Sequence, residues 1–383
     1  MRALALLLLW AGAAFGEARF AVVIGANRGE ADEVVLRFAE RDAARFADVL
    51  TGFAGVPEEH LTLLKGRDAG RVQAAFAPLA GRIAAAGAAG HETVLFVYYS
   101  GHADAQALHL GGSRLPLAGL KGLVDAAGAT VAVLVVDACR SGALTRVKGA
   151  APAEPFEIHA EDRLASEGTA IIASSAAGED AQESDQLEGG VFSHHLIAGL
   201  LGAADATGDR VVSLSEAYRY AYAETLRTTS RARFVQHPTY DFRLRGRDDL
   251  AVTRLTDDGG RGRVRLAGAG AWLLLPQGRG EVVELSAEAG AEVLVVPGTY
   301  VVRFRGEAGL LEATTTVAGG QTTALAPGGM VAVPYGLAVR KGISGERRAA
   351  VGPLVAAEIS GPCGTASRCW GGAPSACASI CPT

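Results

Sequence analysis

Between residues 20 and 245, apolar runs alternate with amphipathic segments, and this alternation constrains the fold more than any other feature of the chain. The apolar runs have the length of buried strands, and they lie at 20–25, 60–66, 93–101, 130–138 and 168–175. The remaining segments carry apolar residues at helical spacing, and we expect helices at 34–53, 70–87, 114–127, 191–202 and 213–227. Strands and helices in alternation form a mostly parallel sheet with helices on both faces. We therefore predict an α/β fold for this region.

The sequence changes character beyond Arg245. Short β-type runs are separated there by glycine-bearing turns every eight to twelve residues, which is typical of a small all-β sandwich. We predict such a sandwich over residues 248–330, followed by a glycine-rich tail that contains cysteines over 331–383.

The first sixteen residues combine a short basic start, an apolar stretch from Ala3 to Ala14, and small residues at positions 14 and 16. This stretch is too short to span a bilayer comfortably and has the form of a secretory signal peptide cleaved near Gly16. We therefore expect an exported protein, periplasmic or extracellular. The alternatives are a buried first helix, or an intracellular protein whose N-terminus merely imitates a signal.

Composition limits the partners of the chain. Its 383 residues carry a net charge of −5, and 49% of them are hydrophobic. These values describe an ordinary globular protein without the basic character that nucleic acid requires. We expect no nucleic-acid partner.

Cysteine placement separates one thiol from the rest. Four of the five cysteines crowd the last 21 residues, at Cys363, Cys369, Cys377 and Cys381. In an oxidising compartment they are expected to form two disulfides, with three connectivities open. A zinc site fits less well, because the intervening five, seven and three residues match no tight paired-ligand pattern. The tail could also be a disordered end or a reading-frame artefact. Cys139 stands apart and needs a chemical explanation.

Two successive runs of the predicted sheet end in reactive side chains. His102 follows the third run in "YYSGH", and Cys139 follows the fourth in "VVDAC". Ligands of open α/β sheets bind at the carboxyl ends of strands, so the imidazole and the thiol meet at one edge if these strands are neighbours. A neutral thiol is a poor nucleophile and needs a base. The pair predicts acyl transfer, in which Cys139 attacks a carbonyl and His102 protonates the leaving amine.

Simpler interpretations stay open for these residues. A lone cysteine is often an inert core residue, and His102 could merely cap the end of a strand. We expect His194 and His195 to be surface residues near the start of a helix, although one of them could be the dyad partner instead. Motifs of other enzyme classes, such as G-x-S-x-G, the P-loop and H-E-x-x-H, do not occur in the sequence.

The chain contains, in order, the strings "VIGANRG", "LRFAERDA", "LFVYYSGH" and "VLVVDACRSG". Their order and spacing resemble the caspase-like cysteine peptidases, specifically the bacterial metacaspase and orthocaspase branch. The likeness covers roughly residues 20–245, and the later strings "ASSAAGEDAQES" and "GVFSHHLIAGLLGAA" extend it. The resemblance implies a caspase-like sandwich of helices around a mostly parallel sheet over 18–247, and a cysteine-type endopeptidase.

The resemblance also implies roles for individual residues. Asp42 and Asp137 match the aspartates that line the specificity pocket of metacaspases, and the backbone N–H groups of Ala103 and Cys139 match the oxyanion hole. The family usually has glycine where Ala103 stands. Two carboxylates in a half-closed pocket favour a guanidinium or ammonium group, which implies cleavage after Arg or Lys. Without the resemblance, Asp42 would be an ordinary solvated helix charge, paired with Arg41 or Arg45.

The segment 145–168 resembles the loop at which family members cut themselves, with Arg146, Lys148 and Arg163 as candidate positions; an ordinary surface loop is the alternative. Calcium activates many metacaspases and calcium activation is possible here, but the sequence has no D-x-D-x-D-G loop and we predict no metal site. The expected partners are protein or peptide substrates, with an envelope partner possible through the β-sandwich. The competing hypothesis is a catalytically inert caspase-like scaffold of the cell envelope.

Overall fold

The structure is a computed structural model. It describes residues 16–139, 167–177, 179–230, 235–245, 249–255, 260–278, 282–306 and 309–333. Contacts within the chain place all of these residues in one compact unit. No helix among them is long and apolar enough to cross a membrane.

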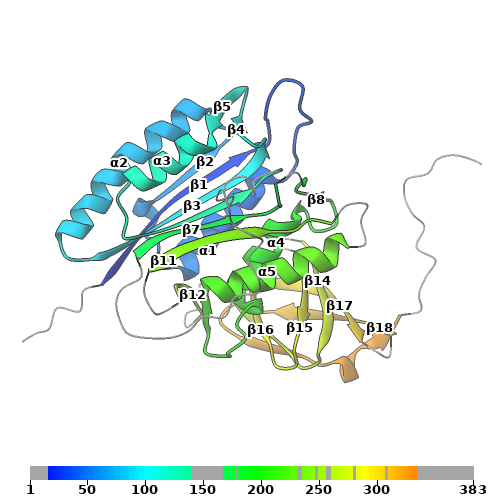
Figure 1. The fold of residues 1–383 in the computed structure, drawn as a ribbon. Helices are drawn as coiled ribbons and strands as arrows, with labels where there is room; N and C mark the ends of the chain where they lie inside the picture. Colours follow the sequence, from blue (N-terminus) through cyan, green and yellow to red (C-terminus); the bar gives the residue numbers. More distant parts are fainter. Residues whose placement is uncertain are drawn as a thin grey trace, which may run out of the picture. The chain divides into compact units, whose positions relative to one another are not determined.

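A central sheet organises the first part of the chain (Figure 1). Its strands lie in the order β11-β7-β6-β3-β1-β2. All neighbours are parallel except β11 and β7, which are antiparallel. The bounds are β1 Glu17–Ala26, β2 Leu61–Lys65, β3 Glu92–Ala103, β6 Val131–Asp137, β7 Glu167–Ala173 and β11 Thr239–Arg245. The predicted, mostly parallel sheet is thereby confirmed.

Helices cover both faces of this sheet (Figure 1), as the sequence predicts. Alternate residues of a strand point to opposite faces, and β1 divides accordingly. Ala21 and Val23 pack into one core with helices α1, α4 and α5, whereas Phe20, Val22 and Ile24 pack into the other with α2 and α3. The helices span α1 Ala39–Phe53, α2 Ala69–Ala88, α3 Leu117–Ala126, α4 Val191–Ala198 and α5 Leu214–Thr229. Helix α4 continues into a short π-helical turn, η3 Gly199–Ala203.

Helix α1 begins at Ala39, so the prediction of a helix from residue 34 is wrong at its N-terminus. Residues 27–38 form a loop, which we call the β1–α1 loop. Its backbone bonds back on itself, because Leu36 N donates to Asn27 O at 2.8 Å. The amides of Arg37 and Phe38 donate to the carboxylate of Glu183, a residue distant in sequence. These bonds replace the helical turn that the apolar spacing suggested.

A small hairpin extends β3 beyond the main sheet. β4 Ala107–Leu110 pairs with the end of β3 and with β5 Ser113–Pro116. The turn between β4 and β5 consists of Gly111 and Gly112, with φ of 60° and 84°, a left-handed backbone that glycine adopts at little cost. This hairpin supports the β1–α1 loop, because Gly111 N and Gly112 N donate to the carbonyls of Arg28 and Gly29.

The C-terminal β region, residues 262–332, contains one sheet ordered β16-β13-β19 and another ordered β15-β14-β17-β18-β20. Its buried side chains, such as Trp272 and Tyr300, belong to the same hydrophobic core as the α1, α4 and α5 face of the central sheet. The extra β-rich sheets predicted beyond the α/β part are therefore present. Their strands span β13 Gly262–Leu266, β14 Gly270–Pro276, β15 Val283–Ala287, β16 Glu292–Val295, β17 Gly298–Gly306, β18 Gly309–Val317, β19 Thr322–Leu325 and β20 Val331–Ala332.

Candidate active site

The register between β3 and β6 places His102 and Cys139 at the same edge of the sheet. The two strands are parallel neighbours, and their last paired residues are Ser100 and Asp137. His102 and Cys139 each follow two residues later along their own chain segments. Cys139 is half-buried, and its Sγ lies 3.9 Å from the carbonyl oxygen of Ala181.

The orientation of the His102 ring is set by the β1–α1 loop. Nε2 lies 2.7 Å from the carbonyl oxygen of Val34. A carbonyl can only accept, so Nε2 carries a proton in this contact and Nδ1 is the basic nitrogen of the neutral ring. The backbone is fixed too, because the hydroxyl of Tyr99 donates to His102 O at 2.6 Å. A backbone carbonyl thus supplies the third, orienting partner of the imidazole.

Ala103 ends β3 and pairs with Leu108 in β4. Its methyl group is buried in the hydrophobic core on the α2 and α3 face, together with Leu108 and Leu115. The alanine that replaces the usual glycine therefore places its side chain in the core.

The two predicted pocket carboxylates converge on one glycine. Asp42 comes from α1 and Asp137 from the end of β6, and both approach β9 (Gly189–Gly190). Gly190 N donates to Asp42 Oδ2 at 2.7 Å. A Cβ added at Gly190 would lie 2.6 Å from Asp137 Oδ2 and 3.3 Å from Asp42 Oδ2. The sequence contains no local signal for this role of Gly190.

Asp42 is fully buried, so it is not an ordinary solvated helix charge. Burial raises its pKa to about 7, and the charges of Asp137 and Glu183 act in the same direction, while the Gly190 N–H and Arg45 oppose them. Arg45 Nη1 lies 3.7 Å from Asp42 Oδ1, and no described residue forms a hydrogen bond with that oxygen. Asp42 therefore has a buried carboxylate oxygen with spare accepting capacity.

Asp137 is buried as well, and burial raises its pKa above the usual range. Ser193 in α4 opposes this effect, because its backbone N–H and its hydroxyl both donate to Asp137 Oδ2. Ser193 also bonds to the hydroxyl of Tyr98 in β3. Burial raises the pKa of Tyr98, and the charges of both aspartates add to this effect. Sequence reasoning missed Ser193, Tyr98 and Glu183, which reach the site from separate elements.

The expectation that His194 and His195 are surface residues is wrong. Both side chains are fully buried, because α4 is covered on one side by the sheet and on another by the C-terminal β region. His194 Nε2 accepts from the backbone N–H of Glu284 in β15 at 3.3 Å. His195 Nε2 lies 2.9 Å from Thr228 Oγ1. Burial lowers the pKa of both rings, that of His195 to about 3.

Several predicted residues lie outside the described part of the chain. These are the candidate self-processing positions Arg146, Lys148 and Arg163, the tail cysteines, and nearly all of the proposed signal peptide. Within the described ranges, no group of three or more His, Cys, Asp or Glu side chains could hold a metal ion.

Comparison with known proteins identifies the class. The family model of the caspase domain matches residues 18–247. The chain therefore belongs to the caspase domain family, whose members are cysteine peptidases. Among solved structures, caspase-1 from Spodoptera frugiperda is 14% identical, with a TM-score of 0.42, and the match covers 59% of this chain and 88% of that one. The structure of pro-sf-caspase-1 is 12% identical, with a TM-score of 0.42 and coverage of 60% and 88%. No curated protein matches the chain significantly.

Proposed function

We propose that this chain is a cysteine endopeptidase of the metacaspase branch that cleaves peptide bonds after Arg or Lys with a His102 and Cys139 dyad. One observation carries the proposal. The carboxylates of Asp42 and Asp137 converge on Gly190, and Asp137 stands two residues before Cys139 at the end of β6. A pair of buried carboxylates thus adjoins the strand ends that bear an imidazole and a thiol.

In the proposed reaction, His102 Nδ1 takes the proton from the Cys139 thiol, and the thiolate forms a bond to the carbonyl carbon of the substrate. The backbone N–H groups of Ala103 and Cys139 donate to the resulting oxyanion. The imidazolium returns its proton to the leaving amine as the peptide bond breaks, which leaves a thioester. A water molecule then attacks the thioester with His102 as the base, and the acid product and the thiol are released.

The acidic pocket suits a basic side chain on the substrate. A guanidinium offers five N–H donors in a planar fork that fits carboxylates. Asp42 Oδ1, which accepts no hydrogen bond from any described residue, would receive one of these donors. An ammonium group can pair with the same oxygens, whereas a carboxylate would meet two buried acids. We therefore assign the pocket to Arg or Lys on the carbonyl side of the cleaved bond.

Hydrolysis of matched fluorogenic peptides that end in Arg, Lys, Asp or Leu tests the proposal, with and without calcium. We expect turnover of the Arg and Lys peptides by the wild type, and a loss of about 10⁴-fold or more in Cys139→Ala and His102→Gln. Turnover of the Asp peptide would contradict the pocket assignment but keep the dyad. Absence of turnover in every condition would favour the inert scaffold.

We further propose that the first sixteen residues direct export and that the C-terminal β region holds an envelope partner. The signal-peptide pattern of the sequence supports the former. Sequencing the N-terminus of the protein recovered from each cell fraction checks it, because cleavage near Gly16 is expected only for the exported form. Comparison of wild type with Cys139→Ala in the same experiment shows whether cuts at Arg146, Lys148 or Arg163 depend on the thiol.

A further inference from the structure

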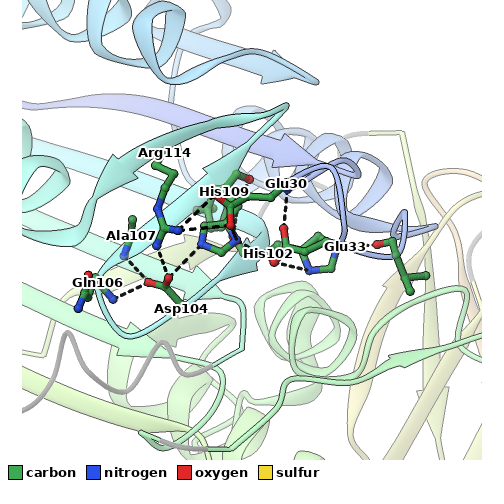
Figure 2. Close-up of polar contacts among 10 residues, drawn as sticks. Glu30, Glu33, His102, Asp104, Gln106, Ala107, His109 and Arg114 are labelled. Carbon is green, nitrogen blue, oxygen red and sulfur yellow. Dashed lines mark hydrogen bonds and ion pairs between the residues drawn. The ribbon is translucent and has the colours of Figure 1, made fainter.

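A carboxylate of the β1–α1 loop lies between two histidines that face each other across β3 and β4. His102 and His109 are paired residues in this hairpin. Glu33 Oε1 lies 2.7 Å from His109 Nδ1 and 3.9 Å from His102 Nδ1 (Figure 2). Glu33 Oε2 accepts from the backbone N–H of Glu30 at 2.6 Å. Glu33 is therefore the acidic group next to the nitrogen of His102 that must gain and lose the catalytic proton.

Further polar contacts surround His109, the hydrogen-bond partner of Glu33. His109 Nε2 lies 3.3 Å from Asp104 Oδ2, and the amides of Gln106 and Ala107 donate to Asp104 Oδ1 (Figure 2). Arg114 in β5 bonds to both Asp104 and Glu30. The hairpin therefore holds the β1–α1 loop through side chains as well as through its backbone.

Glu33 is held in its charged form. Burial alone would raise its pKa, but the N–H of Glu30, the hydrogen bond from His109 and the charges of His102 and His109 outweigh burial, and the net pKa is lowered. A carboxylate 3.9 Å from His102 Nδ1 attracts the positive charge that the ring acquires during the reaction. Tyr99 lies nearby as well: burial raises its pKa, and the charges of Glu33 and Cys139 both add to that effect.

The same loop also carries the carbonyl that orients His102. Val34 follows Glu33 directly, and its oxygen is the 2.7 Å partner of His102 Nε2. The Val34 side chain is 82% exposed, so packing of that side chain does not hold this carbonyl in place. Backbone hydrogen bonds fix the rest of the loop, and the contacts of Glu33 with His109 and with Glu30 N anchor the residue next to this carbonyl.

We propose that Glu33 is a positioning residue for His102, which acts by stabilising the imidazolium that forms when Cys139 loses its proton and by fixing the Val34 carbonyl against Nε2. This inference rests on the proposed cysteine peptidase function. It adds an acidic member to the dyad, and that member comes from a loop without a catalytic signature in sequence.

The test compares Glu33→Gln with Glu33→Asp and with Asp32→Asn. The Gln variant removes the charge while it keeps the shape, the Asp variant keeps the charge, and Asp32→Asn removes an exposed carboxylate of the same loop. Two readouts apply to each: the pH profile of peptide hydrolysis, and the rate at which iodoacetamide alkylates the peptide containing Cys139, followed by mass spectrometry. Alkylation needs no peptide substrate, so it measures the thiolate independently of the proposed function.

We expect Glu33→Gln to slow alkylation of Cys139 at pH 7 about tenfold and to move the alkaline limb of the kcat profile about one unit lower, with KM unchanged. Glu33→Asp should recover part of both losses, and Asp32→Asn should match the wild type. Equal alkylation rates and profiles in Glu33→Gln and the wild type would overturn the inference, as would equal losses in Asp32→Asn. If no peptide is cleaved but alkylation still depends on Glu33, the positioning role stands and only the proposed function fails.

Discussion

At the scale of single residues, Asp42 carries a cost for the stability of the fold. It is fully buried beside a second buried acid, Asp137, and its pKa is raised to about 7. An ionised carboxyl is costly to bury, so an apolar or amide side chain at this position would give a more stable fold. This loss of stability is expected if the Asp42 carboxylate binds the cationic side chain of a substrate, as proposed above.

This cost predicts how Asp42→Asn changes stability with pH. Below about pH 3.8 the acid is protonated in the folded and unfolded chains alike. Between that value and pH 7 the unfolded chain loses the proton while the folded chain keeps it, so the wild type loses stability as pH rises. Asparagine does not titrate. We therefore expect Asp42→Asn to gain at most about 4 kcal/mol in the free energy of unfolding at pH 8 relative to its effect at pH 4.

Urea unfolding of wild type and variant at the two pH values measures this gain. Asp125→Asn serves as the control, because Asp125 is half-exposed in a helical pair with Lys121 and is expected to change stability by less than about 1 kcal/mol at either pH. A loss of stability in Asp42→Asn that is equal at pH 4 and pH 8 would mean that Asp42 is not buried as a strained acid.

At the scale of elements, the sequence was sufficient for the main strands and helices but not for the joins between them. Buried parallel strands leave apolar runs that stand out, whereas β11, with the alternating sequence "TYDFRLR", lies at the edge of the sheet and leaves a weaker signal. The four-residue strands β4 and β5 are too short for a periodic pattern. Residues 34–38 of the β1–α1 loop are predicted as the start of a helix because the segment 34–53 fits helical spacing, although Val34 and Val35 are in fact exposed.

The site divides in the same way. Two strand ends place His102 and Cys139, and strand order alone predicts their proximity. The acidic pocket is different, because Asp42 was singled out only through a family resemblance. Gly190 and Ser193, which bond to the two aspartates, lie about 150 residues downstream of Asp42 in the sequence. A pattern within one short segment cannot predict contacts between residues so far apart in the chain.

Gly190→Ala tests the role of β9 as the wall of the pocket. Gly190 has an ordinary backbone conformation, with φ of −61°, so the effect of a methyl group is steric. The methyl would press on Asp137 and Asp42, and we expect kcat/KM for Arg peptides to fall at least about tenfold and the free energy of unfolding to drop by about 1–3 kcal/mol. Alkylation of Cys139 by iodoacetamide should remain at the wild-type rate.

Gly52→Ala provides the matched control for this substitution. Gly52 lies inside α1, and an added methyl would meet nothing within 4 Å. Because alanine is the better helix former, stability should rise by about 0.5–1 kcal/mol without a change in kcat/KM. Unaltered cleavage of Arg peptides by Gly190→Ala would refute the assignment of β9 to the pocket.

At the scale of the whole molecule, α4 connects the buried Asp137 with the C-terminal β region. Ser193 bonds to Asp137 on one side, and the next residue, His194, accepts from the backbone of β15 on the other. The hydrophobic core runs continuously through both parts. The C-terminal β region therefore holds α4, and α4 in turn bonds to Asp137. We expect the α/β part and the C-terminal β region to unfold together.

His194 makes this joint unfolding sensitive to acid. Its pKa is lowered by burial, with the nearby charges of His195 and Arg45 adding to the effect, so the folded chain keeps it neutral while the unfolded chain protonates below about pH 6.5. Stability is then lost as pH falls below that value. Glutamine can still accept from Glu284 N but takes up no proton, so His194→Gln should lessen the decline by up to about 1.4 kcal/mol per pH unit.

The measurement follows acid unfolding with two probes in a Trp10→Phe, Trp370→Phe background, which leaves Trp272 of β14 as the one tryptophan. Far-UV circular dichroism reports on the helices of the α/β part, and Trp272 fluorescence reports on the C-terminal β region, in which its side chain is fully buried. Coincident transitions that shift together to lower pH in His194→Gln are expected, since α4 lies in the hydrophobic core that the two parts share. A Trp272 transition that precedes the helical one and ignores the substitution would show that the β region unfolds as an independent unit.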